Sequence, residues 1–212
     1  MMASPMQPIS FHRSVCFSLL AMIIGNLFGW SSGLAVDRER SLTGHLLVAT
    51  REMKDPRFVE SVIYIVKHDA QGAMGLVINK PIAKGLIDDL LKSSGREANG
   101  SQETIVIHYG GPVGRRHGFM LHTDDHVIEG TKKLGHGMAM TADVKMLEAL
   151  ATGKGPRRWL FMIGYAGWAP GQLEAELKTG SWFTLPSDQA LIFGSDADKK
   201  WRQAVDKRQI PL

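Results

Sequence analysis

The stretch "GYAGWAPGQLEAELKTGSW" occupies residues 164–182 and holds four glycines, two tryptophans and a Pro-Gly pair in nineteen residues. It continues an apolar run, 159–165, whose composition is typical of a buried strand. Further on, Leu173 and Leu177 are four residues apart, so they would share one face of a helix. Pro170 suits the first position of a helix, and Gly180 suits the residue just past its end. The stretch therefore predicts a core strand, a glycine corner and a helix over 169–180.

Two interpretations of this corner are open. In the structural one, Trp168 fills the core, Gly171 takes a helical conformation that tolerates alanine, and Gln172 or Glu174 caps the helix. In the functional one, the helix start after a glycine loop presents free N–H groups to an anionic ligand. Glu174 and Glu176 near that end would repel an anion, and they already complement the helix dipole. This favours the structural interpretation.

The composition is that of an ordinary globular protein. The chain has 212 residues, of which 44% are hydrophobic and 22% charged. Its formal net charge is +4 and its pI is about 9.2. Nucleic-acid-binding proteins usually concentrate their basic residues on one face. Here they occur as scattered pairs separated by carboxylates, which predicts solvated surface: Arg115-Arg116, Lys132-Lys133, Arg157-Arg158 and Lys199-Lys200.

The first 35 residues have the layout of an export signal. His12 and Arg13 precede an uncharged run, 15–30, and small residues then lead to a cleavage point near Ala35. The run is short for a membrane span. We expect residues 1–35 to be a signal peptide or membrane anchor, and the protein to be periplasmic or membrane-anchored. If a start codon is mis-assigned, the tail is fictitious and the protein is cytoplasmic.

The remaining residues, 36–212, are enough for one domain with its own core. The only cysteine, Cys16, lies in the apolar tail, so the folded part has no thiol for a disulfide, a redox pair or a thiolate metal site. We predict no cofactor.

Short apolar runs bounded by turn residues dominate the rest of the chain, with fewer amphipathic segments among them. Thr141 is the expected N-cap of one helix, with Gly153 just past its end. The pattern predicts an α+β fold with at least seven strands. The expected strands are 45–50, 61–68, 75–80, 104–109, 118–122, 159–165 and 190–194, and the expected helices are 87–94, 141–153, 169–180 and 198–207.

Three segments together resemble the AlgH/YqgE family of bacterial proteins. They are "LTGHLLVATREMKDPRFVESVIYIVKHDAQGAMGLVINKP" (42–81), "YGGPVGRRHGFMLH" (109–122) and "AGWAPGQLEAELKTGSWF" (166–183). The resemblance implies a single compact α+β domain whose bifurcated, mostly antiparallel sheet curls into a pseudo-barrel. It also implies an unsolved function, because some members are labelled transcriptional regulators only by association with alginate production. The apolar tail departs from the family pattern and argues against a nucleic-acid partner if the protein is exported.

Familiar catalytic motifs are missing from the sequence. Between its glycines, "GYAGW" offers Tyr165 and Ala166 where a nucleophile elbow needs serine. No phosphate-binding loop of the Gly-x-x-x-x-Gly-Lys-Ser/Thr type is present. The Gly110-Gly111-Pro112 segment puts proline where such a loop needs a backbone donor, and a sharp turn between two strands is the favoured interpretation.

The histidines give no convincing metal site. "HTDDH" places His122 and His126 four residues apart, a spacing that makes a shared metal face only on a helix. This segment follows an expected strand and carries a Thr-Asp-Asp turn signature. We therefore expect structural or surface histidines and no bound metal.

Two functional classes remain. The first is a non-enzymatic binding or regulatory module that holds a protein segment or small molecule in a groove beside the Gly110-Gly111-Pro112 turn and the Trp168 loop. The second is a hydrolase-type enzyme, which requires Asn79, His122, Tyr165 and Glu174 to converge. The candidate groove residues are Asn79, Gly110, Gly111, His122, Tyr165, Trp168, Gln172 and Glu174.

Overall fold

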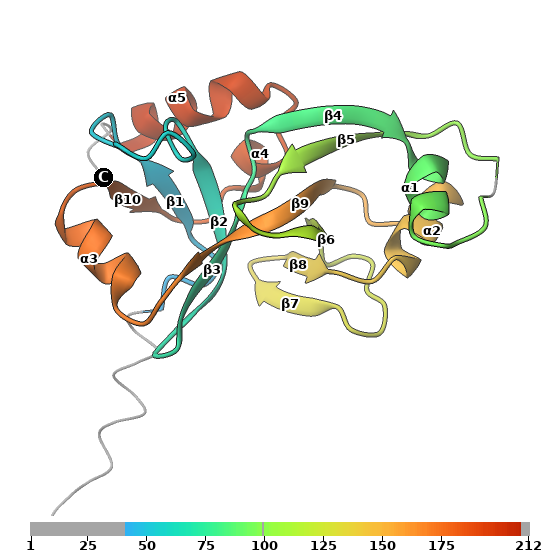
Figure 1. The fold of residues 1–212 in the computed structure, drawn as a ribbon, viewed down its shortest axis with the longest axis horizontal. Helices are drawn as coiled ribbons and strands as arrows, with labels where there is room; N and C mark the ends of the chain where they lie inside the picture. The colour runs from blue at the N-terminus through green and yellow to red at the C-terminus, as the bar shows by residue number, and fades with distance from the viewer. Residues whose placement is uncertain (1–40, 99, 209–212) are drawn as a thin grey trace, which may run out of the picture.

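The computed structural model describes residues 41–98 and 100–208 and shows a strongly curled, mostly antiparallel sheet with helices around it (Figure 1). The predicted signal, 1–35, lies outside the described residues. The strands are β1 (Leu46–Ala49), β2 (Val62–Asp69), β3 (Gly72–Val77), β4 (Pro81–Leu86), β5 (Thr104–Tyr109), β6 (Val113–Thr123), β7 (Lys132–Gly135), β8 (Met138–Thr141), β9 (Trp159–Trp168) and β10 (Trp182–Leu185). The helices are α1 (Ile87–Ser93), α2 (Lys145–Ala151), α3 (Gln172–Lys178), α4 (Gln189–Ile192) and α5 (Ala197–Arg208).

The sheet is bifurcated at β9, which runs through the centre of the molecule (Figure 1). One edge of β9 pairs with β6, in antiparallel register from His122↔Trp159 to Gly118↔Ile163. The other edge pairs first with β5, in parallel, and then with β3, in antiparallel register. The change from β5 to β3 falls at Gly164, whose φ of +76° kinks the strand. The fold is therefore the bifurcated α+β domain curled into a pseudo-barrel that the family resemblance implied.

The connection from β5 to β6 passes directly over this kink. β5 and β6 lie on opposite edges of β9, so Gly110 and Gly111 must cross it. The amide of Gly110 donates to the carbonyl of Ile163 at 2.8 Å, and its own carbonyl accepts from Val77 at 3.0 Å. A Cβ atom on Gly110 or Gly111 would overlap the backbone of Gly164 or Tyr165. The segment is thus a tight backbone crossing between two strands.

Both faces of β1 and β2 are buried, which explains their continuous apolar composition. Leu46 and Val48 face one core together with Ala204 of α5. Leu47 and Ala49 face a second core on the other side, which α3 covers. Figure 1 shows α5 and α3 on opposite sides of this half of the sheet. In the other half, α1 and α2 pack on β5, β6 and β9 around a third core.

Six of the seven expected strands form close to their predicted positions. The seventh, 190–194, is wrong, because α4 occupies Gln189–Ile192. Its start is capped by Asp188, whose Oδ1 accepts from the amides of Ala190 at 2.9 Å and Leu191 at 3.2 Å. A five-residue apolar run fits a strand or a buried helical turn equally well, and this cap selects the turn.

Two predicted helix starts are also wrong. Thr141 is the last residue of β8 and does not cap α2, which begins at Lys145. Pro170 is not the first helical residue of α3, because Gly171 precedes that helix in the left-handed region at φ +75°. The predicted glycine stops are confirmed, since Gly153 and Gly180 have φ of +70° and +76°. Within the described residues, no helix is long and apolar enough to cross a membrane.

The crossing predicts unequal costs for two glycine substitutions. Gly110→Ala should lower the free energy of unfolding by about 3 kcal/mol, because its Cβ meets the Gly164 carbonyl. Gly171→Ala should cost only about 1 kcal/mol, since its positive φ is disfavoured for alanine but its Cβ would meet open space. Urea unfolding measures both values. Equal losses of unfolding free energy in the two variants would contradict the close contact between Gly110 and Gly164.

The second core predicts the effect of truncating Trp168, which is 7% exposed and packs with Leu173 of α3 and Trp182 of β10. Trp168→Ala should cost roughly 3–5 kcal/mol, the range for removing a buried large aromatic side chain. Trp168→Phe keeps a ring in place and should cost clearly less. A Trp168→Ala protein as stable as the parent in chemical denaturation would show that Trp168 does not fill the core.

Candidate binding groove

A groove of about 790 Å³ lies beside the β5–β6 crossing and the end of β9. It is called the Trp168 groove here. Three parts of the chain form it: the loop before β2, the start of β6, and the β9–α3–β10 segment. The lining residues are Glu52, Met53, Lys54, Asp55, Arg57, Phe58, Pro112, Val113, Gly167, Trp168, Gln172, Glu176, Thr179, Ser181 and Trp182.

Three aromatic rings stack edge to face along this groove. The Trp168 and Trp182 ring centroids are 6.1 Å apart with an interplanar angle of 79°. The Phe58 and Trp182 centroids are 5.6 Å apart at 66°. Aromatic pairs prefer this geometry, and it fixes the rings against one another. The groove therefore has a rigid aromatic floor.

The carboxylate of Glu176 holds the two tryptophans together. Its Oε2 accepts from Trp168 Nε1 at 2.9 Å and from Trp182 Nε1 at 2.7 Å. Its Oε1 accepts from Gln172 Nε2 at 2.9 Å, one helical turn earlier on α3. All three donors are neutral, so the carboxylate keeps its full negative charge within the groove. No ion pair to Glu176 occurs among the described residues.

Two basic side chains line the groove, Lys54 and Arg57, and Arg57 is already engaged. Arg57 Nη2 lies 2.6 Å from Asp55 Oδ2, and this hydrogen-bonded pairing lowers the pKa of Asp55. The guanidinium also lies over the Phe58 ring, 5.6 Å from its centroid. Arg57 is held by its own loop, and among the described residues the exposed Lys54 forms no ion pair with Glu176.

Of the eight residues proposed from the sequence, Trp168 and Gln172 line this groove. Gln172 does not cap α3 as predicted, because its Oε1 accepts from the Ala169 amide at 3.0 Å, before the helix. Gly110 and Gly111 form the crossing that places Pro112 and Val113 at the groove. That any of these residues binds a ligand stays a prediction.

Asn79 and His122 have structural partners elsewhere. Asn79 Oδ1 accepts from the Val62 amide at 2.8 Å, and its Nδ2 donates to the Glu60 carbonyl at 2.8 Å. His122 Nδ1 donates to the carbonyl of Thr123 at 2.8 Å, and its Nε2 accepts from Thr141 Oγ1 at 2.8 Å. Burial lowers the pKa of His122 and favours its neutral form.

Tyr165 and Glu174 also serve the fold. Tyr165 packs edge-on against Phe119, with centroids 6.0 Å apart. Glu174 Oε1 lies 2.7 Å from His68 Nε2, while His68 Nδ1 accepts from the Leu42 amide at 3.0 Å. This contact ties α3 to β2 and to the first described segment. The sequence analysis did not predict this contact of His68, because His68 and Glu174 are 106 residues apart in the chain.

The hydrolase-type alternative therefore lacks its site. Asn79, His122, Tyr165 and Glu174 bond or pack with four different sets of neighbours, and they do not line a common cavity among those described. The "HTDDH" segment forms the end of β6 and a turn, with Asp125 bound to Thr123 and Arg157. Within the described residues, no group of three or more His, Cys, Asp or Glu side chains could hold a metal ion.

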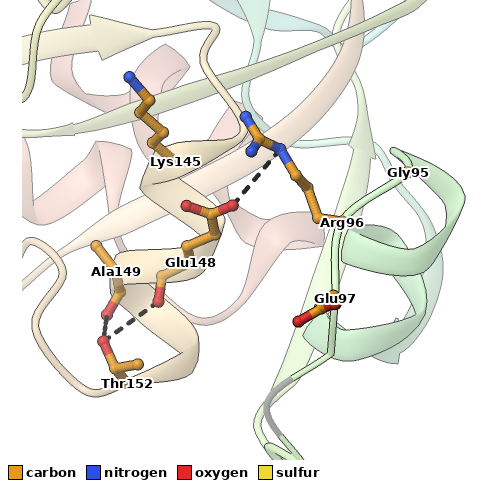
Figure 2. Close-up of a pocket in the computed structure, with 7 residues that line it drawn as sticks. All are labelled: Gly95, Arg96, Glu97, Lys145, Glu148, Ala149 and Thr152. Carbon is orange, nitrogen blue, oxygen red and sulfur yellow. Dashed lines mark hydrogen bonds and ion pairs between the residues drawn. The ribbon is translucent and has the colours of Figure 1, made fainter.

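A second cavity, of about 670 Å³, lies between α2 and the chain that follows α1 (Figure 2). Figure 2 shows Arg96 facing Glu148 across it, with Nε 3.5 Å from Oε1. Thr152 turns its hydroxyl back to the carbonyls of Glu148 and Ala149. The charges of Arg96 and Glu148 thus offset each other across this cavity, and unlike the Trp168 groove it has no aromatic lining.

Among the lining residues that the sequence analysis did not propose as a site are Glu176, Trp182 and Phe58, which carry the argument above. One signal was present for Glu176, since Gln172 and Glu176 have the four-residue spacing of a helical pair. For Phe58 and Trp182 the sequence has no comparable signal, because their approach depends on β1 lying between β2 and β10.

Comparison with known proteins gives consistent matches. A family model described as AlgH-like matches residues 46–212. A UPF0301 protein of Methylococcus capsulatus is 42% identical over 170 residues, covering 80% of this chain and 93% of that protein. A UPF0301 protein of Rhodospirillum rubrum is 41% identical over 172 residues, covering 81% and 90%.

Two solved structures share the fold. The solution structure of the AlgH protein from Pseudomonas aeruginosa has a TM-score of 0.69 and 37% identity, covering 87% of this chain and 95% of that one. A crystal structure of a protein from Corynebacterium diphtheriae has a TM-score of 0.62 at 20% identity, covering 79% and 87%, and shows the likeness of fold alone. With a model match over most of its length and relatives above 40% identity, the chain belongs to the AlgH-like family.

Proposed function

We propose that this protein is a non-enzymatic binding protein that holds a segment of a partner protein, with a basic side chain, in the Trp168 groove. One observation carries the proposal. The Glu176 carboxylate sits beside two indole rings in an open groove, and it is hydrogen-bonded only to neutral donors.

The chemistry of this arrangement favours a cation. A lysine or arginine side chain gains both from a carboxylate and from aromatic faces, because the ring quadrupole attracts positive charge. Three neutral N–H donors fix the position of the Glu176 carboxylate without cancelling its charge. An incoming cation would then meet an acceptor that is already oriented, which lowers the ordering cost of binding.

The size and rim of the groove favour a peptide segment over a small ion. A volume of about 790 Å³ has room for several side chains. Val113 at the rim is 40% exposed and offers an apolar contact beside the acidic position. A partner segment with a basic residue next to an apolar one would satisfy both features.

Export is the second part of the proposal. Its support is the sequence of residues 1–35, with a basic start, an uncharged apolar run and small residues before the expected cleavage point. The partner would then be a periplasmic or membrane-associated protein. A role in DNA binding would not fit that location.

Selection of peptides tests the groove. Immobilised protein should select, from a random displayed library, peptides in which Lys or Arg adjoins an apolar residue. Synthetic copies of these peptides should bind Glu176→Gln about tenfold more weakly, the loss expected when one charged hydrogen bond is removed. Fluorescence anisotropy measures the affinities, and thermal melting confirms that each variant is folded.

Glu174→Gln is the matched control, because Glu174 lies on the same helix but contacts His68 outside the groove. This variant should bind the peptides as the parent does. If selected peptides bind Glu176→Gln and Glu174→Gln with equal affinity, or show no enrichment of basic residues, the proposed site is wrong.

The proposed cleavage near Ala35 can be tested separately. Expressed in a bacterial host, the mature protein should begin near Val36 and fractionate with the periplasm or the membrane. Intact-mass analysis of the purified protein gives the start directly. Recovery of the full chain from soluble cytoplasm would overturn the export proposal and leave the groove proposal untouched.

A further inference from the structure

A smaller pocket, of about 330 Å³, lies between the β4–β5 pair and the segment from α4 to α5. In Figure 1, β4, β5 and α4 lie near the start of β9, whereas α3 lies beyond its other end. Val106, Leu160, Phe193 and Trp159 give the pocket apolar walls, and Lys200 and His108 are its buried polar members. It is called the Lys200 pocket here. No residue lines both it and the Trp168 groove.

Lys200 brings a positive charge into this apolar setting. The residue is 1% exposed, and its Nζ donates to the carbonyls of Ile192 at 2.7 Å and Ile78 at 3.3 Å. An ammonium group has three donors, and the described residues supply acceptors for two of them. A buried charge with an unused donor is costly unless another group completes its shell. A ligand oxygen would do so.

His108, the other buried polar residue of the pocket, does not accept the third N–H of Lys200 and carries no competing charge. It is 5% exposed, and its Nδ1 donates to the Phe161 carbonyl at 3.2 Å. Burial, with a smaller contribution from the charge on Lys200, lowers the pKa of His108. The imidazole is therefore neutral at physiological pH, and Lys200 is the single buried cation of the pocket.

The start of α5 lies at the mouth of the pocket. Ser195 and Ala197 line the pocket, and α5 begins at Ala197. The helix start is already capped by Asp196, whose Oδ1 accepts from the Lys199 amide at 3.3 Å and whose Oδ2 pairs with Lys199 Nζ at 2.7 Å. Asp198 is a second acidic group in the first turn. The attraction for an anion therefore comes from Lys200 and not from the helix end.

We propose that the Lys200 pocket binds a small monocarboxylate with an apolar body, aromatic or branched aliphatic. One carboxylate oxygen accepts the third N–H of Lys200, and the body packs against Phe193, Trp159 and Val106. A single carboxylate is expected, because the one buried ammonium of the pocket matches a single negative charge. A phosphate with two charges would lack a second buried cation and would face apolar walls.

The pH dependence of binding follows from Lys200. Burial lowers the pKa of Lys200 to about 8. Only the protonated amine attracts a carboxylate, so binding is present below this pKa and lost as the pH rises through it. His108, which faces the pocket from β5, stays neutral over this range, and Asp196, Asp198 and Lys199 near the start of α5 are exposed.

A titration with sodium benzoate tests the proposal on the full chain. In 1H–15N NMR spectra, benzoate should give saturable shifts centred on Gly194, Ser195 and Ala197. The affinity should be about tenfold weaker at pH 9 than at pH 7, since protonation of a group with a pKa of about 8 changes by that factor. Benzamide, which has the same shape without the charge, should bind at least tenfold more weakly than benzoate.

Lys200→Met and Arg202→Met form the matched pair of variants, because Arg202 lies on the same helix but is exposed and does not line the pocket. Methionine replaces the buried ammonium by an apolar group of similar length, a change that folded proteins often tolerate. Lys200→Met should lose benzoate binding, whereas Arg202→Met, which also removes one positive charge from α5, should keep it. Val106→Trp, which fills the pocket from its partly exposed wall, is a second route to the same loss if Lys200→Met does not fold.

Four results would overturn the proposal: no saturable shift in the folded parent protein; equal binding of benzoate and benzamide; unchanged binding in Lys200→Met or Val106→Trp; or shifts centred on Arg157 and Arg158, which line the adjoining cavity. The peptide experiments on the Trp168 groove are independent of all four, because no lining residue is common to both sites.

Discussion

The architecture depends on one steric constraint, the contact between two backbone segments with no side chain between them. Gly110 and Gly111 pass over Gly164 and Tyr165, at a separation that leaves no room for a Cβ atom on either glycine. The crossing carries the chain from one edge of β9 to the other. It also separates β5 from β3 along the same edge, so the division of the sheet and its curl both begin here.

The Trp168 groove is a direct consequence of this crossing. Past the kink, β9 delivers Gly167 and Trp168 to one wall, while the crossing chain delivers Pro112 and Val113 to another. Burial of Trp168 and its place in the groove are compatible, because its ring packs in the second core while its Nε1 reaches Glu176. The same side chain therefore supports the fold and positions the acidic group on which the proposed function rests.

The two halves of β9 border two separate cavities. Trp159 and Leu160 at its start border the Lys200 pocket, and Gly167 and Trp168 at its end border the Trp168 groove. An extended strand rises about 3.3 Å per residue, so these ends are up to roughly 30 Å apart. A peptide in one site and a small acid in the other would not compete for the same surface. The structure thus keeps the groove and the pocket apart.

The sequence by itself determined the fold class, most strand positions and the helix ends that glycines mark, because these follow from local periodicity and backbone preference. The run 104–109, for example, became β5 with the same bounds. Composition could not separate strand from helix over 190–194, where a cap at Asp188 decided the outcome. Nor could it show that Gly171 lies at positive φ, since Pro-Gly is common both before and inside a helix start.

Only the tertiary structure determines where the candidate groove and the Lys200 pocket lie. His122 and Asn79 resembled site residues in the sequence, yet pairing of β6 with β8, and of the loop before β2 with the end of β3, used their polar atoms for structural bonds. The Lys200 pocket had no sequence signal, because Lys200 meets the carbonyl of Ile78 across 122 residues. Burial, long-range hydrogen bonding and the pKa that follows from them arise only when distant segments pack together, and the linear pattern does not carry that information.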